Sequence, residues 1–124
     1  MKEIIAIIRM NKVNETKRAL LDIGVYGMTA LKVMGRGEMT IDFSGLNGSG
    51  EELRGLIEDT LSQGGRLIPK RLFFIVVPDE QVKLVVDTII GVNQTGNKGD
   101  GKLFVLPVMD LIRARTGERG EAAM

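Results

Sequence analysis

Apolar residues follow the same pattern twice along this chain. In the first half, the β-branched run at residues 3–8 predicts a buried strand, a helical stretch follows, and residues 28–34 predict a second strand. In the second half, the order returns as an apolar run at residues 72–77, a helical stretch and a run at residues 103–109. The apolar residues that share one face of each helix are Val13, Ala19, Leu20 and Ile23 in the first half and Val82, Val85, Val86 and Ile89 in the second.

Residues at the ends of these runs predict where the elements begin and end. Asn11 and Asp79 are suited to cap the N-termini of the two helices, and Gly24 stands where a helix C-terminal glycine belongs. Pro107 indicates an edge position or a bulge for the last strand, because proline cannot donate to a sheet ladder. Two tandem β-α-β units in one domain of 124 residues predict an α+β fold, the ferredoxin-like split β-α-β sandwich. Both helices would cover one face of its antiparallel sheet, and we expect oligomerisation to cover the other.

A long connection, at about residues 38–67, separates the two halves. Connections of this length are uncommon in compact domains and are usually functional. Ser49 and Glu52 form a capping-box pattern at the start of an amphipathic helical segment. The apolar face of this segment consists of Leu53, Leu56, Ile57 and Leu61. We interpret the connection as a flexible arm whose short helix docks on a partner; the alternative is a lid that packs on its own domain.

Residues 95–104 carry the strongest chemical signal, with three glycines and two lysines among polar residues. Glycine lets backbone N–H groups approach a ligand closely and lysine adds a cation, as a phosphate-binding loop requires. The spacing Gly96-x-x-x-x-Gly101-Lys102 fits a Walker motif, but Leu103 replaces the hydroxyl residue that would hold magnesium. In addition, a strand rather than a helix is expected to follow. The segment therefore predicts a different kind of phosphate loop, with a plain glycine-rich hairpin turn as the alternative.

Composition excludes several classes of protein. The chain has neither Cys nor His, which removes disulfides, thiolate nucleophiles, the common zinc sites and the usual general base. A formal net charge of +1 gives no general attraction to nucleic acid or membranes, and an aromatic content of 4% is too low for an RNA-recognition surface. No apolar segment approaches membrane-spanning length and the N-terminus lacks a signal-peptide pattern, so we expect a cytoplasmic protein without membrane insertion.

The glycine-rich segment belongs to a longer set of motifs. It reads Thr-x-x-x-Gly-Asp-Gly-Lys followed by an apolar pair, with the residues Thr95, Gly99, Asp100, Gly101, Lys102, Leu103 and Phe104. Further motifs stand at residues 1–8, 27–29, 76–79 and 113–118. With these motifs the chain resembles the PII signal-transduction proteins, trimeric sensors of ATP, ADP and 2-oxoglutarate that control nitrogen metabolism. The resemblance covers nearly the whole chain outside the central arm, and it implies a regulator without catalytic residues.

The resemblance also implies a nucleotide site in each cleft between subunits. Lys102 would pair with the phosphates inside the loop formed by Gly99, Asp100 and Gly101. Arg113 and Arg115 would reach the same phosphates from the adjacent subunit with their forked guanidinium groups. The other residues of the implied nucleotide pocket are Thr29, Gly35, Arg36, Gly37 and Val76. No metal ligand of the protein is implied here, and magnesium would arrive with ATP.

The chain departs from the common PII pattern around its arm. Glu38 and Met39 replace an Arg-Gln pair whose Gln normally binds magnesium in the 2-oxoglutarate site, although Lys70 matches the lysine that pairs with the effector carboxylate. The arm is about a dozen residues longer than usual. It also lacks a tyrosine for uridylylation, because Tyr26 is the only tyrosine in the chain. This combination resembles the nitrogen-fixation-cluster PII subgroup, in which a pair of paralogues inhibits nitrogenase, and the chain matches the long-arm paralogue.

The expected function is therefore that of a nitrogen-status sensor in a homotrimer or in a heterotrimer with a PII paralogue, with nitrogenase as the target of the arm. One alternative is a general PII regulator of an ammonium channel or a nitrogen-assimilation enzyme. A further alternative is an ATP-hydrolysing enzyme that uses Asp100, Asp110 or Glu118 as its base.

Overall fold

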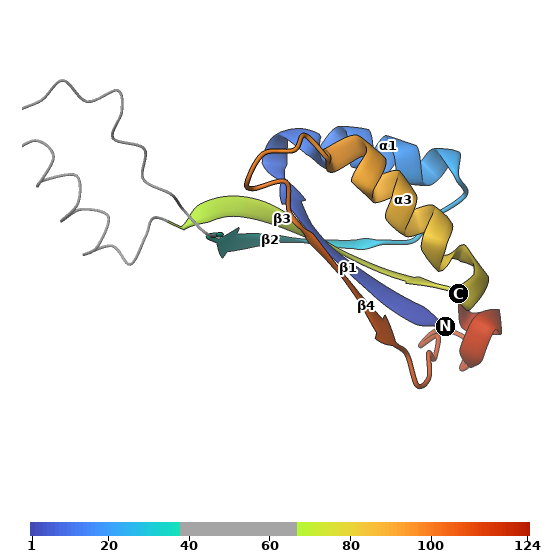
Figure 1. The fold of residues 1–124 in the computed structure, drawn as a ribbon. Coiled ribbons are helices and arrows are strands. Elements are labelled where there is room, and N and C mark those ends of the chain that lie inside the picture. Colours follow the sequence, from blue (N-terminus) through green and yellow to red (C-terminus); the bar gives the residue numbers. More distant parts are fainter. Residues whose placement is uncertain (38–66) are drawn as a thin grey trace, which may run out of the picture.

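The computed structural model of the protein describes residues 1–37 and 67–124 (Figure 1). Its longer elements are, in chain order, β1 (Lys2–Arg9), α1 (Val13–Asp22), β2 (Thr29–Gly35), β3 (Ile68–Val77), α3 (Val82–Asn93) and β4 (Lys102–Pro107). Short 3-10 helices η1 (Met10–Lys12) and η2 (Asp79–Gln81) lead into the two α-helices, and η3 (Gly120–Ala123) lies near the C-terminus. The predicted amphipathic helix with Leu53, Leu56, Ile57 and Leu61 lies outside the described residues.

The four described strands form one antiparallel sheet in the order β2-β3-β1-β4. The two central strands pair in a register that places Ala6 opposite Phe73 and Arg9 opposite Lys70. Helices α1 and α3 lie side by side across one face of the sheet (Figure 1). This strand order with both helices on one face confirms the predicted ferredoxin-like α+β fold.

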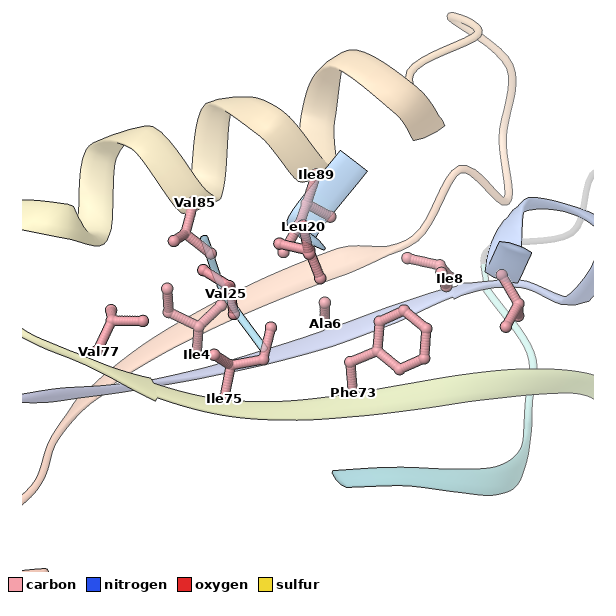
Figure 2. Packing of buried hydrophobic residues seen from close by; sticks show 11 residues of the cluster. Ile4, Ala6, Ile8, Leu20, Val25, Phe73, Ile75, Val77, Val85 and Ile89 are labelled. Atoms are coloured by element: carbon pink, nitrogen blue, oxygen red, sulfur yellow. The ribbon is translucent and has the colours of Figure 1, made fainter. Parts of the chain in front are cut away.

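The hydrophobic core lies between this face and the helices (Figure 2). Strand β1 alternates strictly, so that Ile4, Ala6 and Ile8 are buried while the residues between them are partly exposed. The remaining core residues are Phe73, Ile75 and Val77 from β3, with Val13, Leu20, Val25, Val85 and Ile89 from the helices and the connection after α1. Full burial of such a side chain contributes roughly 1.5–3 kcal/mol, so this cluster is the main source of stability for the described part of the fold.

The opposite face of the sheet is apolar as well, but residues 1–37 and 67–124 leave it uncovered. Ile5 pairs with both Phe74 and Phe104, which places these three side chains in one row on this face. Leu31, at 54% exposure, and Phe104, at 47%, are far more accessible than core residues of the same kind. We call this surface, formed by Ile5, Ile7, Leu31, Leu72, Phe74, Phe104 and Leu106, the open face. An apolar face of this kind is typical of a subunit interface.

Both predicted N-terminal helix caps were wrong. Asn11 lies inside η1, and α1 begins after Lys12 without a side-chain cap. Asp79 lies in the first turn of η2, where its carboxylate pairs with the N-terminal ammonium group at 2.9 Å. The physical reason is the same at both sites: a 3-10 turn precedes the helix, and its carbonyl groups accept the N–H groups of Val13 and Val82.

The remaining boundaries agree better with expectation. Gly24 has φ +86° and follows α1 in a Schellman arrangement, because its N–H binds Leu21 O and the next N–H binds Leu20 O. Pro107 ends β4, which is an edge strand as predicted, two residues before the expected end. Strand β3 begins at Ile68, four residues earlier than expected, since residues 68–71 pair with β2.

Candidate functional site

The glycine-rich segment connects the end of α3 to the start of β4, so the alternative of a plain hairpin turn is wrong. Its glycines Gly96, Gly99 and Gly101 have φ values of +84°, +96° and +112°. A Cβ on Gly101 would overlap the backbone carbonyl of Ile7, and one on Gly99 would lie 3.3 Å from the guanidinium group of Arg9. At Gly101 and Gly99 the segment passes so close to the end of the sheet that a side chain has little or no room, whereas Gly96 is set apart by its positive φ alone.

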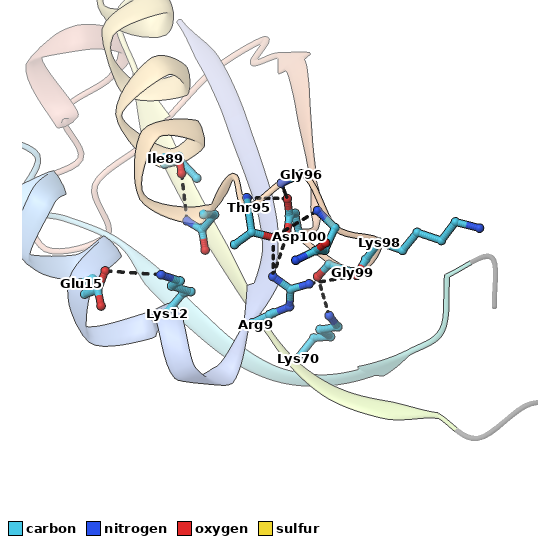
Figure 3. Close-up of polar contacts among 12 residues, drawn as sticks. Arg9, Lys12, Glu15, Lys70, Ile89, Thr95, Gly96, Lys98, Gly99 and Asp100 are labelled. Atoms are coloured by element: carbon cyan, nitrogen blue, oxygen red, sulfur yellow. Dashed lines mark hydrogen bonds and ion pairs between the residues drawn. The ribbon is translucent and has the colours of Figure 1, made fainter. Parts of the chain in front are cut away.

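Asp100 organises this segment from within (Figure 3). Its carboxylate accepts hydrogen bonds from the N–H of Thr95 at 2.7 Å, the N–H of Gly96 at 3.0 Å and the Thr95 hydroxyl. The fourth donor is Arg9, whose Nη1 lies 2.6 Å from Oδ1. The hydrogen bonds from Thr95, followed by those from Arg9 and Gly96, hold the pKa of Asp100 well below its usual range. Asp100 is thus an ionised structural acceptor, which makes it a poor general base.

Two cations at the end of the sheet bind the outer part of the loop. The guanidinium of Arg9 donates from Nη2 to the carbonyl of Lys98 at 2.9 Å, and Lys70 donates from Nζ to the carbonyl of Gly99 at 2.9 Å. Partial desolvation and the nearby Arg9 lower the pKa of Lys70. Arg9 was missed in the sequence, because its importance depends on the strand register that sets it opposite Lys70.

Several predicted nucleotide-site residues gather at this end of the sheet, which we call the loop end. Lys102 is the exposed first residue of β4 and pairs with Ile7. Gly35 ends β2 opposite Ile68, so the predicted residues Arg36 and Gly37 leave the sheet at this end too. The loop end therefore combines backbone turns with the cations Arg9, Lys70 and Lys102, an arrangement suited to an anion.

Another group of predicted residues lies at the opposite end of the sheet, which we call the terminal end. Thr29 and Val76 line a pocket of about 680 Å³ together with Tyr26, Phe74, Leu111 and Met124. Both chain termini lie near this end (Figure 1).

Arg113 and Arg115 lie in the C-terminal segment at the terminal end. The N–H of Gly117 donates to the carbonyl of Arg113 at 2.7 Å and closes a turn that contains Arg115. The Arg113 guanidinium pairs with Glu118 at 3.4 Å and donates to the carbonyl of Met124 at 3.1 Å. The structure thus orders Arg113 and presents Arg115 on the surface.

Within one chain, the predicted site residues at the loop end lie far from those at the terminal end. Strand β1 runs from Glu3, opposite Val76, to Arg9, opposite Lys70. At about 3.4 Å per residue, the six steps span roughly 20 Å. Lys102 and Arg113 therefore lie near opposite ends of the sheet.

A family model and several known proteins are similar to this chain and identify its family. Residues 1–118 match the family model described as "Nitrogen regulatory protein P-II". The chain belongs to the PII family. A PII relative from Methanosarcina barkeri, named nitrogen fixation nifHD1 region GlnB-like protein 2, is 48% identical, with 100% of this chain and 99% of the relative covered. A nitrogen fixation nifHD region GlnB-like protein 2 from Methanococcus maripaludis is 46% identical over the whole of both chains, and one from Methanobacterium ivanovii is 46% identical over 100% of this chain and 99% of its own length.

These relatives confirm the resemblance to PII proteins of the nitrogen-fixation region. They make this chain a member of a family of nitrogen regulatory proteins. Within residues 1–37 and 67–124, no helix is long and apolar enough to cross a membrane. The same residues contain no cluster of three or more acidic side chains that could hold a metal ion.

Proposed function

We propose that this PII protein is a non-catalytic sensor of nitrogen status that binds ATP or ADP in clefts between the subunits of a trimer. The observation that carries the proposal is the internal use of Asp100, which receives four hydrogen bonds from its own loop and from Arg9. With its carboxylate so engaged, the loop faces a ligand with Lys102 and backbone groups rather than with a free negative charge.

The open face supports the assembly. Its row of Ile5, Phe74 and Phe104, in which both phenylalanines are exposed, needs an apolar partner, and a further copy of the chain or of a paralogue supplies one. In such an assembly the loop end of one subunit meets the terminal end of the next. Lys102 then approaches the phosphates from one side and Arg113 and Arg115 from the other, which fits the separation of the two ends within one chain.

Lys70 is the residue that would bind 2-oxoglutarate. A carboxylate of the effector would compete with the Gly99 carbonyl for the Lys70 ammonium group, which now donates to that carbonyl at 2.9 Å. Effector binding at Lys70 would thus weaken a hydrogen bond to the nucleotide loop and couple the two sites. Met39, which replaces the usual magnesium ligand, lies outside the described residues, and a paralogous subunit would supply an intact effector site.

The target that best fits the relatives' names is nitrogenase, reached through the arm at about residues 38–67. The apolar face with Leu53 and Leu56 would dock on it. Changing both residues to Glu should abolish inhibition of nitrogenase while leaving ATP affinity intact. Unchanged inhibition by this double variant would remove the docking helix from the proposal.

Calorimetric titration with Mg-ATP, with and without 2-oxoglutarate, tests the sensor itself. We expect Lys102→Ala to weaken ATP binding about tenfold or more, since a charged contact to phosphate is lost. Lys83→Ala is the matched control, because Lys83 is an exposed cation on α3 that pairs with Asp87. Equal ATP affinity in the two variants, or loss of fold in Lys102→Ala alone, would refute the phosphate role.

A nucleotide-turnover assay addresses the enzyme alternative. Besides Asp100, the two carboxylates nominated as bases are also engaged: Asp110 pairs with Arg119 at 3.0 Å and Glu118 with Arg113 at 3.4 Å. We therefore expect bound ATP to persist unchanged. Steady release of phosphate that tracks the protein concentration would overturn the non-catalytic role.

A further inference from the structure

We propose that Arg9 is a positioning residue for nucleotide binding, which acts by fastening the loop of residues 95–101 to the end of the sheet. This inference rests on the proposed function, because it assigns Arg9 a part in the same site. Arg9 belongs to neither the glycine-rich motif nor the C-terminal segment, and it reaches the loop from the last position of β1.

A single guanidinium group holds the loop at separate points. Its Nη1 atom lies 2.6 Å from the Asp100 carboxylate and 3.5 Å from the Thr95 hydroxyl. Its Nη2 atom donates to the Lys98 carbonyl at 2.9 Å. The forked shape of arginine suits this use, because its N–H groups lie in one rigid plane but point in different directions. They can therefore donate to a carboxylate and to a carbonyl at the same time.

The loop needs such an attachment. Its three glycines with positive φ have unusually large conformational freedom in the absence of other constraints. A loop that is already ordered loses less entropy when a ligand binds, and so binds more tightly. Figure 3 shows Arg9 beneath the segment from Thr95 to Asp100, between the loop and the sheet.

Arg9 also balances charge. The hydrogen bonds that lower the pKa of Asp100 keep it ionised at neutral pH, so the loop contains a fixed negative charge. The side chains of Arg9 and Asp100 are only 27% and 21% exposed, and a charge left alone at this depth would repel an incoming phosphate. Without Arg9, the loop would keep the hydrogen bond from Lys70 to the Gly99 carbonyl, but it would lose its other side-chain attachments to the sheet and the cation paired with Asp100.

The test uses the variants Arg9→Gln, Arg9→Lys, Asp100→Asn and the double variant Arg9→Gln/Asp100→Asn. Affinity for Mg-ATP is measured by calorimetry, and hydrogen exchange of the amides at residues 95–101 is measured without nucleotide. We expect Arg9→Gln to weaken Mg-ATP binding about tenfold, or about 1.4 kcal/mol, and to speed exchange in the loop. Arg9→Lys keeps the charge but not the fork and should lie between. Lys83→Gln removes a cation that pairs on α3 and should change neither readout.

The double variant separates positioning from direct contact with the ligand. If Arg9 acts through Asp100, removing both should weaken binding no more than the more damaging single change, because the same interaction is lost. Additive losses, or weaker binding with unchanged loop exchange, would identify Arg9 as a direct ligand and overturn the inference. If Arg9→Gln does not fold, Arg9→Lys and Asp100→Asn provide the same comparison.

The outcome for the proposed function can be read separately. Normal binding of Mg-ATP by the wild-type chain together with unchanged binding by Arg9→Gln overturns the role of Arg9 alone. Failure of the wild-type chain to bind Mg-ATP overturns the nucleotide site and, with it, the part that Arg9 would play there.

Discussion

Replacing the loop glycines by alanine one at a time should produce a graded series, because the three positions differ in their surroundings. Gly96 has φ +84° and open space around a would-be Cβ, so Gly96→Ala carries only backbone strain. That strain is about 1–2 kcal/mol for an L-residue in a left-handed conformation. Gly101 has φ +112° and faces the Ile7 carbonyl of the neighbouring strand. Backbone atoms there cannot move aside without shifting β1 against β4.

We therefore expect Gly101→Ala to cost about 3–4 kcal/mol, the strain plus a local displacement of backbone. Gly99→Ala should fall between the two, since its neighbours are the flexible ends of the Arg9 and Lys70 side chains at 3.3 and 3.7 Å. Gly91→Ala is the control with opposite sign: Gly91 lies inside α3, has no left-handed φ and meets nothing within 4 Å. This change should stabilise the protein by up to about 1 kcal/mol.

The assay is urea unfolding followed by circular dichroism at one fixed protein concentration, because the proposed trimer would make the measured stability depend on concentration. Comparison of midpoints at equal slope gives the differences in the free energy of unfolding. If Gly101→Ala and Gly96→Ala unfold at the same midpoint, the close approach of the loop to β1 does not determine the need for glycine.

Other changes test other parts of the molecule. Thr16→Val should lower the free energy of unfolding by about 1–3 kcal/mol, because it leaves the buried Asn93 amide without the hydroxyl that accepts its hydrogen bond at 3.0 Å; equal urea midpoints would contradict this. The pKa of Asp100 is lower in the folded than in the unfolded protein, so its network should stabilise the fold above about pH 4 and lose this contribution as the pH falls further. Asp100→Asn should flatten the decline of thermal stability below about pH 4, and an unchanged decline would show that the network is not its source. Phe104→Glu on the open face should dissociate the assembly in light scattering, whereas Leu84→Glu, a change of similar exposure on α3, should not; intact assemblies in both variants would refute the interface.

Periodicity located every strand and both helices of the described residues, because side-chain burial has different periods in the two structures. The capping residues Asn11 and Asp79 correctly mark the approach of a helix, but the prediction that they cap it failed. A 3-10 turn lies there, and its carbonyl groups accept the first helical N–H groups. Periodicity also placed the start of β3 too late. Residues 68–71 look like part of the connection, since Pro69, Lys70 and Arg71 are not apolar, and only their pairing with β2 makes them a strand.

The candidate site was predicted in part for a similar reason. The motif from Thr95 to Lys102 is local, so its glycines and its lysine can be recognised from spacing alone. The contacts of Arg9 with Lys98 and Asp100 span about ninety positions of sequence and depend on the register of β1 against its neighbours. A spacing rule has no access to such contacts. The charge environment of Lys70 has the same origin, because it follows from the cross-strand position of Arg9.

The separation of the loop end from the terminal end has a genetic consequence. If each cleft of the proposed trimer takes Lys102 from one chain and Arg113 from the next, a defect in either residue damages a cleft but not the whole subunit. Coexpressed chains with Lys102→Ala and Arg113→Ala would then build mixed rings that contain an undamaged cleft, and each allele would partly rescue the other. Alleles that both affect the loop end could not complement in this way. For the same reason, a duplicated gene could lose one half of its site while its partner preserved the other.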